Sequence, residues 1–129
     1  MQHAKSYTAF FNAAALWNFS AAGLFLFMAM FNHTLLRFFL NIIPESFVWF
    51  YSFLALVIGY GIGYYWVGQD VHKNRDIIKM GVFGKTMVVI LFTKGWLAGA
   101  ITILALGAGI VDLIFTLFFI AVLFKTKKG

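Results

Sequence analysis

The sequence predicts an all-α integral membrane protein, in which residues 1–129 form one domain folded as an antiparallel four-helix transmembrane bundle. The first reason is composition, because 63% of the residues are hydrophobic and only 11% are charged. A soluble domain carries about 25% charged residues, and so short a chain cannot bury such an apolar excess. The second reason is four apolar runs of helix-spanning length, at about 9–31, 46–67, 77–93 and 97–124. The third is the uneven distribution of positive charge between these runs.

The first predicted span, residues 9–31, has 23 residues without a charged side chain. About 20 apolar residues are needed for a helix to cross the hydrocarbon core, so this run is long enough to cross it once. Small residues gather at 13–15 and at 21–23, where they would let a neighbouring helix approach closely.

The segment at residues 35–44 has two interpretations. Arg37 and Asn41 are four residues apart among apolar neighbours, which fits a short helix in the membrane interface with Phe38 turned inward. The alternative is a plain loop with an exposed arginine. Pro44 then favours the start of the next helix, because proline is tolerated in a first turn.

The second predicted span, residues 46–67, has aromatic residues near both ends, as in an interfacial belt. The three glycines at 59–63 do not form a dinucleotide fingerprint, because no strand precedes them and no βαβ unit surrounds them. Gly59 and Gly63 instead form a GxxxG face, which we expect to pack on the small residues of the first span.

The polar segment at residues 68–79 is interpreted as a solvated loop. Asp70 or Asn74 can cap the helix that follows. Asp70, His72 and Asp76 lie close in sequence, but metal ligands must converge and be braced by further contacts. The chain has no cysteine, which excludes disulfides, thiolate metal sites and cysteine nucleophiles. We therefore expect no metal and no cofactor.

The third predicted span, residues 77–93, is at the short limit for a membrane helix. Gly81 and Gly84 offer a face for close helix contact beside Lys85. We expect this span to end at Lys94-Gly95-Trp96, where a charge, a flexible residue and an interfacial aromatic side chain come together.

The fourth predicted span, residues 97–124, would be about 42 Å long at 1.5 Å per residue. This length exceeds a core of about 30 Å, so the helix must tilt, protrude or kink at the glycines of 107–109. A rival interpretation puts the turn at 107–109 and buries Lys94 in a longer third span. That interpretation leaves another unpaired charge at membrane depth.

Positive side chains predict the orientation. With four spans, both termini and the middle polar segment lie on one side of the membrane. That side would carry Lys5, Lys73, Arg75, Lys79, Lys125, Lys127 and Lys128, and the other side would carry Arg37 and Lys94. The positive-inside rule therefore predicts an inner (plasma) membrane protein with both termini in the cytoplasm. This placement accounts for the net charge of +6 without a nucleic-acid partner.

Two opposite charges lie inside the apolar runs, Lys85 in the third and Asp112 in the fourth. A charge at membrane depth is costly and usually has a partner, so we predict that these side chains meet in the bundle interior. One interpretation is that the pair only locks two helices in register. The other is a ligand- or proton-responsive site, to which Asn12, Asn18 or Tyr60 would add polar groups.

The second half of the chain resembles a known family. The sequences GIGYYWVGQDVHKNRDIIKMGVFGK and IVDLIFTLFFIAVLF are similar to those of small bacterial four-helix membrane proteins of the DoxX-like group. The matching features are residues 59–70, Arg75, Gly81, Gly84, Lys85 and Asp112. The resemblance implies a four-helix bundle that assists redox or lipid-linked enzymes, and it carries over no catalytic residue.

We favour a non-enzymatic function, an accessory or lipophilic-ligand-binding membrane protein with the Lys85–Asp112 pair in its interior. One alternative is a small oligomeric transporter that uses Asp112 as a proton or cation site. The other is a membrane enzyme that modifies a lipid, for which few convergent acid–base residues are present. The expected partners are membrane lipid and, through the glycine faces, a second copy of the chain or another membrane protein.

Overall fold

The computed structural model describes residues 2–127, and every regular element within this range is an α-helix. The helices are α1 (Gln2–Phe31), α2 (His33–Leu36), α3 (Val48–Gln69), α4 (Arg75–Leu97) and α5 (Ile103–Lys125). The prediction of an all-α fold is therefore confirmed.

Three of these helices are long and apolar enough to cross a membrane, over Lys5–Phe31 of α1, Val48–Gln69 of α3 and Ile103–Lys125 of α5. This finding is what a membrane protein requires. Helix α4 has a similar length of 23 residues, but it is less apolar than the other three and carries Lys85 at its middle.

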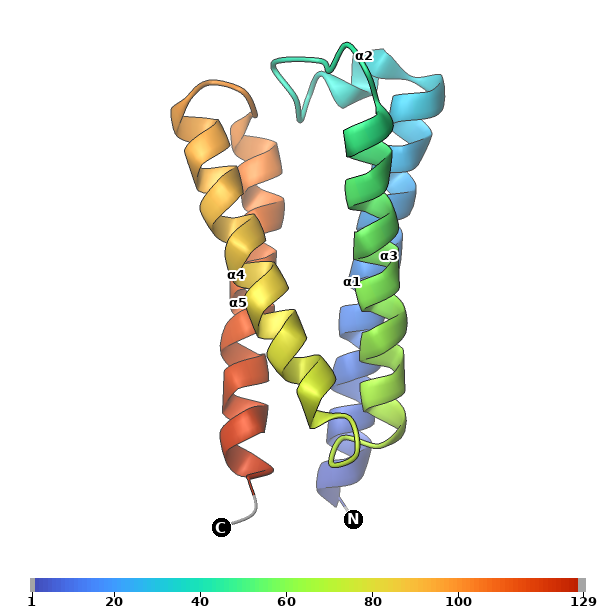
Figure 1. Ribbon diagram of the computed structural model, residues 1–129, viewed down its shortest axis with the longest axis vertical. Helices are drawn as coiled ribbons and strands as arrows, with labels where there is room; N and C mark the ends of the chain where they lie inside the picture. Colours follow the sequence, from blue (N-terminus) through green and yellow to red (C-terminus); the bar gives the residue numbers. More distant parts are fainter. Residues whose placement is uncertain (1, 128–129) are drawn as a thin grey trace.

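The fold consists of two helix pairs. Helix α1 packs along α3, and α4 packs along α5 (Figure 1). The pairs meet at the end where both chain termini lie, next to the turn that joins α3 to α4, and they diverge toward the opposite end. The long helices run antiparallel to their neighbours in sequence.

At the diverging end, the segment after α2 reaches across to the turn between α4 and α5 (Figure 1). The amide of Asn41 donates to the carbonyl of Ala100 at 2.9 Å, and the amide of Thr102 donates to the carbonyl of Phe39 at 2.9 Å. A helix over residues 35–44 does not form, because α2 ends at Leu36, local turn bonds continue only to Leu40, and the amides of Asn41 and Ile42 donate to the carbonyl of Ala100.

The turn between α4 and α5 lies later than predicted. Helix α4 continues through Lys94-Gly95-Trp96, and the chain reverses where Gly99 adopts a φ of +80°. The amide of Ala100 donates to the carbonyl of Gly95 at 2.8 Å, which closes a Schellman motif that requires a left-handed residue at Gly99. Thr102 then caps α5, since its side chain accepts from the amide of Ala105. The prediction of a turn at residues 94–96 is wrong, because all three residues keep a helical backbone and the left-handed conformation falls at Gly99.

The rival turn at residues 107–109 is also wrong, because these residues lie within α5. A Cβ on Gly109 would lie 3.4 Å from Phe92, so this glycine faces the neighbouring helix α4. Since α5 begins at Ile103, its 23 residues extend over about 34 Å. The excess over a core of about 30 Å is therefore only about 4 Å, and no kink at the glycines is required.

The glycines of α3 contact other partners than predicted. Gly61 and Gly68 face α1, where a Cβ would lie 2.7 Å from Phe19 at the first position and 3.2 Å from Asn12 at the second. Gly63 faces Ile77 of α4, at 3.0 Å. At Gly59, apart from the adjacent residues and the nearby backbone of α3 itself, no atom of the described chain lies within 4 Å of a Cβ. The prediction that Gly59 and Gly63 would pack on α1 is therefore wrong. Helix α3 turns the side that carries Gly61 and Gly68 toward α1.

The glycines of α4 do provide close contact, as predicted. A Cβ on Gly81 would lie 2.8 Å from the ring of Tyr64, and a Cβ on Gly84 would collide with the ring of Tyr60. Two tyrosines one turn apart on α3 thus rest on two glycines one turn apart on α4. This contact fixes the rotation of α4 and turns Lys85, the residue after Gly84, toward the interior.

The main hydrophobic core lies toward the end where the pairs meet. Its buried members come from all four long helices and the α3–α4 turn, namely Phe11, Ala14, Ala15, Tyr64, Val67, Val71, Ile78, Phe119 and Val122. A second, smaller cluster of Met28, Ala29 and Leu36 joins α1 to α2 at the other end. The middle of the molecule, between these clusters, is where polar side chains enter the interior.

Candidate functional site

Lys85 and Asp112 meet in the interior of the structure. The ammonium Nζ of Lys85 lies 2.6 Å from Oδ1 of Asp112, and the two side chains are 5% and 17% exposed, respectively. Lys85 stands eleventh of 23 residues in α4, and Asp112 stands tenth of 23 in α5. The two side chains predicted to pair are thus brought together near the middle of their helices.

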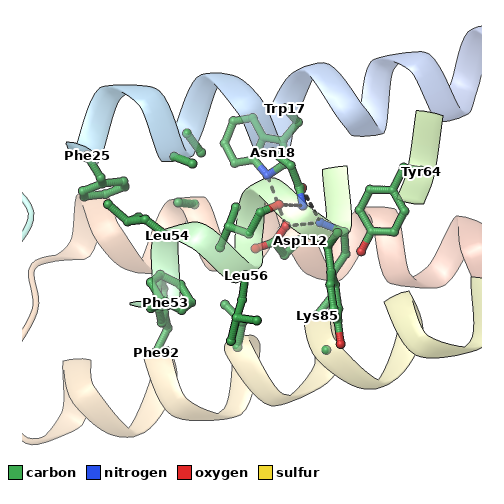
Figure 2. Close-up of a pocket in the computed structure, with 17 residues that line it drawn as sticks. Trp17, Asn18, Phe25, Phe53, Leu54, Leu56, Tyr64, Lys85, Phe92 and Asp112 are labelled. Atoms are coloured by element: carbon green, nitrogen blue, oxygen red, sulfur yellow. Dashed lines mark hydrogen bonds and ion pairs between the residues drawn. The ribbon is translucent and has the colours of Figure 1, made fainter. Parts of the chain in front are cut away.

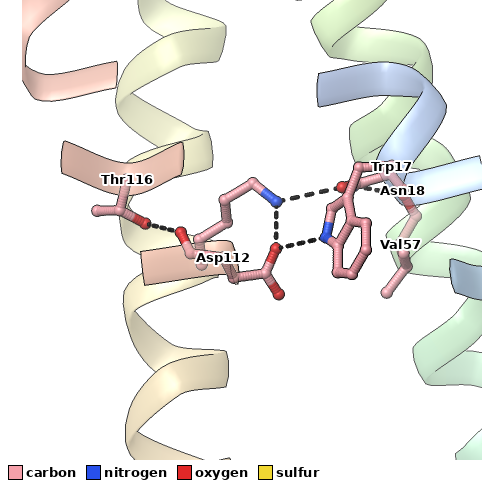
Figure 3. Close-up of polar contacts among 6 residues, drawn as sticks. Trp17, Asn18, Val57, Asp112 and Thr116 are labelled. Carbon is pink, nitrogen blue, oxygen red and sulfur yellow. Dashed lines mark hydrogen bonds and ion pairs between the residues drawn. The ribbon is translucent and has the colours of Figure 1, made fainter. Parts of the chain in front are cut away.

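Helix α1 adds two hydrogen bonds to this ion pair (Figure 3). Lys85 Nζ donates to Oδ1 of Asn18 at 3.1 Å, and Nε1 of Trp17 donates to Oδ1 of Asp112 at 3.1 Å. These bonds connect α1 of one helix pair to both helices of the other pair. We refer to Trp17, Asn18, Lys85 and Asp112 as the polar cluster.

The amide of Asn18 is oriented by α3. Its Nδ2 donates to the carbonyl of Val57 at 3.0 Å, which turns Oδ1 toward Lys85. A Cβ on Gly61 would lie 3.1 Å from Cβ of Asn18, so the glycine makes room for this side chain. Asn18 of α1 therefore connects α1 to α3 and to α4, and it is buried, with 5% of its surface exposed.

Aromatic rings surround the ammonium of Lys85. Its Nζ lies 5.2 Å from the ring centroid of Tyr64 and 5.4 Å from that of Phe115. Within about 6 Å, the face of an aromatic ring attracts a cation. The lysine is thus stabilised by a carboxylate, an amide oxygen and two rings, which together offset part of the cost of burying it.

A cavity of about 230 Å³ lies next to the polar cluster (Figure 2). All four long helices line it, through Trp17, Asn18, Ala21, Ala22, Phe25, Phe53, Leu54, Leu56, Val57, Tyr60, Tyr64, Gly84, Lys85, Val88, Phe92, Ala108 and Asp112. The polar cluster lies to one side, and Phe25, Phe53 and Phe92 lie toward the diverging end of the pairs. The arrangement resembles a binding pocket, which is mostly apolar and has a few converging polar groups.

The other predicted site residues have different positions. Tyr60 lines the cavity, but no hydrogen bond joins it to the polar cluster within the described chain. Asn12 is exposed on α1 and lies against Gly68, so it does not belong to the cavity wall. The prediction that Asn12 would join the interior site is therefore wrong, because it lies six positions before Asn18, about 9 Å along α1 and on a different side of the helix.

Trp17 and Tyr64 were not predicted as site residues. Trp17 could have been recognised because a buried indole N–H usually needs an acceptor. It also directly precedes Asn18, which was predicted as a site residue. Tyr64 is fully buried, and its hydroxyl has no hydrogen-bond partner in the described part of the chain. No sequence signal distinguished it from the interfacial aromatic residues around it.

The polar loop is shorter than predicted, because residues 68–69 belong to α3 and residues 75–79 belong to α4, which leaves residues 70–74 as the turn. Asp70 Oδ1 accepts from the amide of Lys73 at 3.1 Å, and Asp76 pairs with Lys79 at 3.1 Å. Among the side chains described by the structure, those of residues 5–127, no three His, Asp or Glu lie together in a way that could hold a metal ion.

No family model, curated protein or solved structure matches this chain. The resemblance to the DoxX-like group therefore stays a prediction.

Proposed function

We propose that this chain is a four-span membrane protein that binds a lipophilic molecule in the cavity between its helix pairs, in an accessory role rather than as an enzyme. The observation that carries the proposal is the cavity itself, which is lined by four helices and is apolar except beside the ion pair. Pockets for drug-sized ligands have about 300–1,000 Å³. A volume of about 230 Å³ suits a head group and the first part of a chain.

The charges of α4 support its crossing of the membrane as a fourth span. Its 23 residues extend over about 34 Å, which exceeds a core of about 30 Å. Arg75, Asp76 and Lys79 lie in its first turns and Lys94 lies in its last turn, so these charges would reach the two interfaces. The remaining charge, Lys85, is buried and paired, as a charge inside a membrane should be.

The same arrangement supports cytoplasmic termini in the inner membrane. Both termini and the α3–α4 turn lie at one end of the molecule (Figure 1). That end carries Lys73, Lys79 and Lys125, whereas Arg37 and Lys94 belong to the opposite end. An excess of lysine and arginine marks the cytoplasmic side.

A cavity-filling substitution tests the binding function. Ala108 lines the cavity one turn before Asp112 on α5, so Ala108→Leu should occupy the space without changing the polar cluster. Ala121→Leu is the matched control, because Ala121 is an exposed residue of the same helix. After purification in nanodiscs, native mass spectrometry should detect a bound lipophilic molecule on the wild type and on Ala121→Leu, and should not detect it on Ala108→Leu. Equal retention by all three proteins would contradict binding in this cavity.

A second candidate is an oligomeric transporter that uses Asp112 as a proton or cation site. The observation in its favour is that the Asp112 side chain is 17% exposed and lines the cavity. If this candidate is right, Asp112→Asn should abolish pH-driven flux in proteoliposomes while the protein remains folded. Flux that is unchanged in Asp112→Asn would eliminate it.

A further inference from the structure

The carboxylate of Asp112 offers an acceptor to the cavity that the protein does not use. Its Oδ1 accepts from Lys85 Nζ and from Trp17 Nε1. No described residue donates to Oδ2, which is turned away from both donors in Figure 3. Since Asp112 is a wall residue of the cavity and its side chain is partly exposed, Oδ2 is accessible to an occupant.

The donors of the polar cluster, in contrast, already have acceptors. Lys85 donates to Asp112 and to Asn18, Trp17 donates to Asp112, and Asn18 donates to the carbonyl of Val57. The part of the Lys85 ammonium not engaged in these bonds is covered by the rings of Tyr64 and Phe115. The group left for an occupant is therefore an acceptor, Oδ2 of Asp112. We expect the occupant to supply a hydrogen-bond donor.

The charges on the cavity wall are balanced. Lys85 and Asp112 are its only lysine, arginine, aspartate or glutamate residues, and they neutralise each other. An anionic head group would lie next to the Asp112 carboxylate and would compete for Lys85, which leaves one negative charge without a partner in an apolar space. A cationic head group would meet the ammonium of Lys85 in the same way. An uncharged head group avoids both costs.

The hydroxyl of Tyr64 does not offer a second contact to an occupant. It is buried, and it lies so close to α4 that a Cβ on Gly81 would be 3.0 Å from it. The group left for an occupant is therefore Oδ2 of Asp112. A hydroxyl group supplies an uncharged donor for it.

From these observations, and resting on the proposed function, we propose that the ligand is a hydroxyl-bearing lipid. Its uncharged O–H donates to Oδ2 of Asp112, and its chain extends along Phe25, Phe53 and Phe92. The head group would then lie at the polar cluster, and the chain would follow the apolar part of the cavity.

The four tryptophans of the chain allow a direct test by fluorescence quenching. A variant that keeps only Trp17 reports on the cavity, because Trp49, Trp66 and Trp96 are exposed and can be replaced by phenylalanine. A variant that keeps only Trp49, which is 81% exposed, reports the concentration of quencher in the bilayer. Circular dichroism in vesicles checks that both variants retain the helical fold.

The probes are a long-chain alcohol with bromine near its head group, the methyl ether of that alcohol, and the fatty acid of matching length at mildly alkaline pH. The ether differs from the alcohol by the loss of the donor, and the acid carries a negative charge. A hydrogen bond to a charged group is worth enough for the alcohol to quench Trp17 at a roughly tenfold lower membrane concentration than the ether. The Trp49 variant should not discriminate between the three probes.

The outcomes separate the two proposals. Preferential quenching of Trp17 by the alcohol, abolished by Ala108→Leu, supports both the cavity and the hydroxyl inference. Equal quenching by the alcohol and the ether, or stronger quenching by the fatty acid, overturns the hydroxyl inference but leaves ligand binding intact. If no probe quenches Trp17 beyond the level given by Trp49, and Ala108→Leu changes nothing, binding in the cavity fails, and the hydroxyl inference fails with it.

Discussion

Replacing Lys85 by methionine should destabilise the protein strongly. The substitution keeps an unbranched apolar stem but removes the ammonium that lies 2.6 Å from Asp112 and 3.1 Å from Asn18. Removal of one partner of a buried ion pair costs about 3–5 kcal/mol, because the other charge stays buried. The Asp112 side chain is 17% exposed and keeps the bond from Trp17, so we expect a cost near the lower end, about 3 kcal/mol.

The double variant Lys85→Met with Asp112→Leu should recover much of this loss. It removes both charges, and well-packed apolar replacements of a buried pair are often neutral. Trp17 and Asn18 each lose one partner, which costs roughly 1 kcal/mol apiece. The double variant should therefore lie about 2 kcal/mol below the wild type and above the single Lys85→Met variant.

Unfolding by SDS in mixed micelles, followed by circular dichroism, gives the free energies of unfolding for the wild type, both single variants and the double variant. The four values form a double-mutant cycle that isolates the coupling between the two positions. A Lys85→Met variant that loses less than about 1 kcal/mol, or a double variant whose cost equals the sum of the two single costs, would refute the reasoning.

Two further predictions concern packing and topology. Gly84→Ala should lower the free energy of unfolding by about 1–3 kcal/mol, because its Cβ collides with Tyr60. Gly59→Ala, with open space around its Cβ, should be neutral or should stabilise α3 by about 0.5–1 kcal/mol, and SDS unfolding compares the two. Because the chain has no cysteine, Lys73→Cys and Ala98→Cys provide single labelling sites in the turns before and after α4. An impermeant maleimide should label intact cells at position 98 and not at 73, and equal labelling would contradict a crossing by α4.

The ion pair could be predicted from the sequence because its physical requirement is strict. A lysine and an aspartate within apolar runs must find partners, and a short connection between their helices leaves few arrangements. Lys85 and Asp112 satisfy that requirement in the structure at 2.6 Å. The all-α architecture follows from the same composition and run lengths.

The rotation of each helix about its axis could not be predicted. Every α-helix with glycines four apart shows a GxxxG pattern, but Gly59 faces open space whereas Gly61 and Gly68 face α1. Which glycines face α1 depends on where the side chains of α1 need space. Phe19 lies against Gly61, and Asn12 lies against Gly68. Such choices depend on the neighbouring helix, so they cannot be read from one segment alone.

The α4–α5 turn shows the same limit for local signals. Several glycines were candidates, and Lys94-Gly95-Trp96 had the composition of an interfacial turn. The structure uses Gly99 instead, because a Schellman bond from Ala100 and the cap of Thr102 close this turn together. Gly99 ends α4 and Thr102 begins α5, and these two caps together outweigh the composition of a single tripeptide.

Locking the helices and binding a ligand are compatible roles for the polar cluster. Toward the termini, large side chains such as Tyr64 and Phe119 fill the space between the pairs, but at the cavity the facing side chains of Ala22 and Ala108 are small. Across the cavity the rings of Phe53 and Phe92 lie 6.4 Å apart, and the bonds from Lys85 to Asn18 and from Trp17 to Asp112 add a directional connection between the pairs. Hydrogen bonds that hold two walls apart at a fixed distance also preserve the space between them. The cluster can therefore set the helix register and keep the cavity open for an occupant, with one carboxylate oxygen left to bind it.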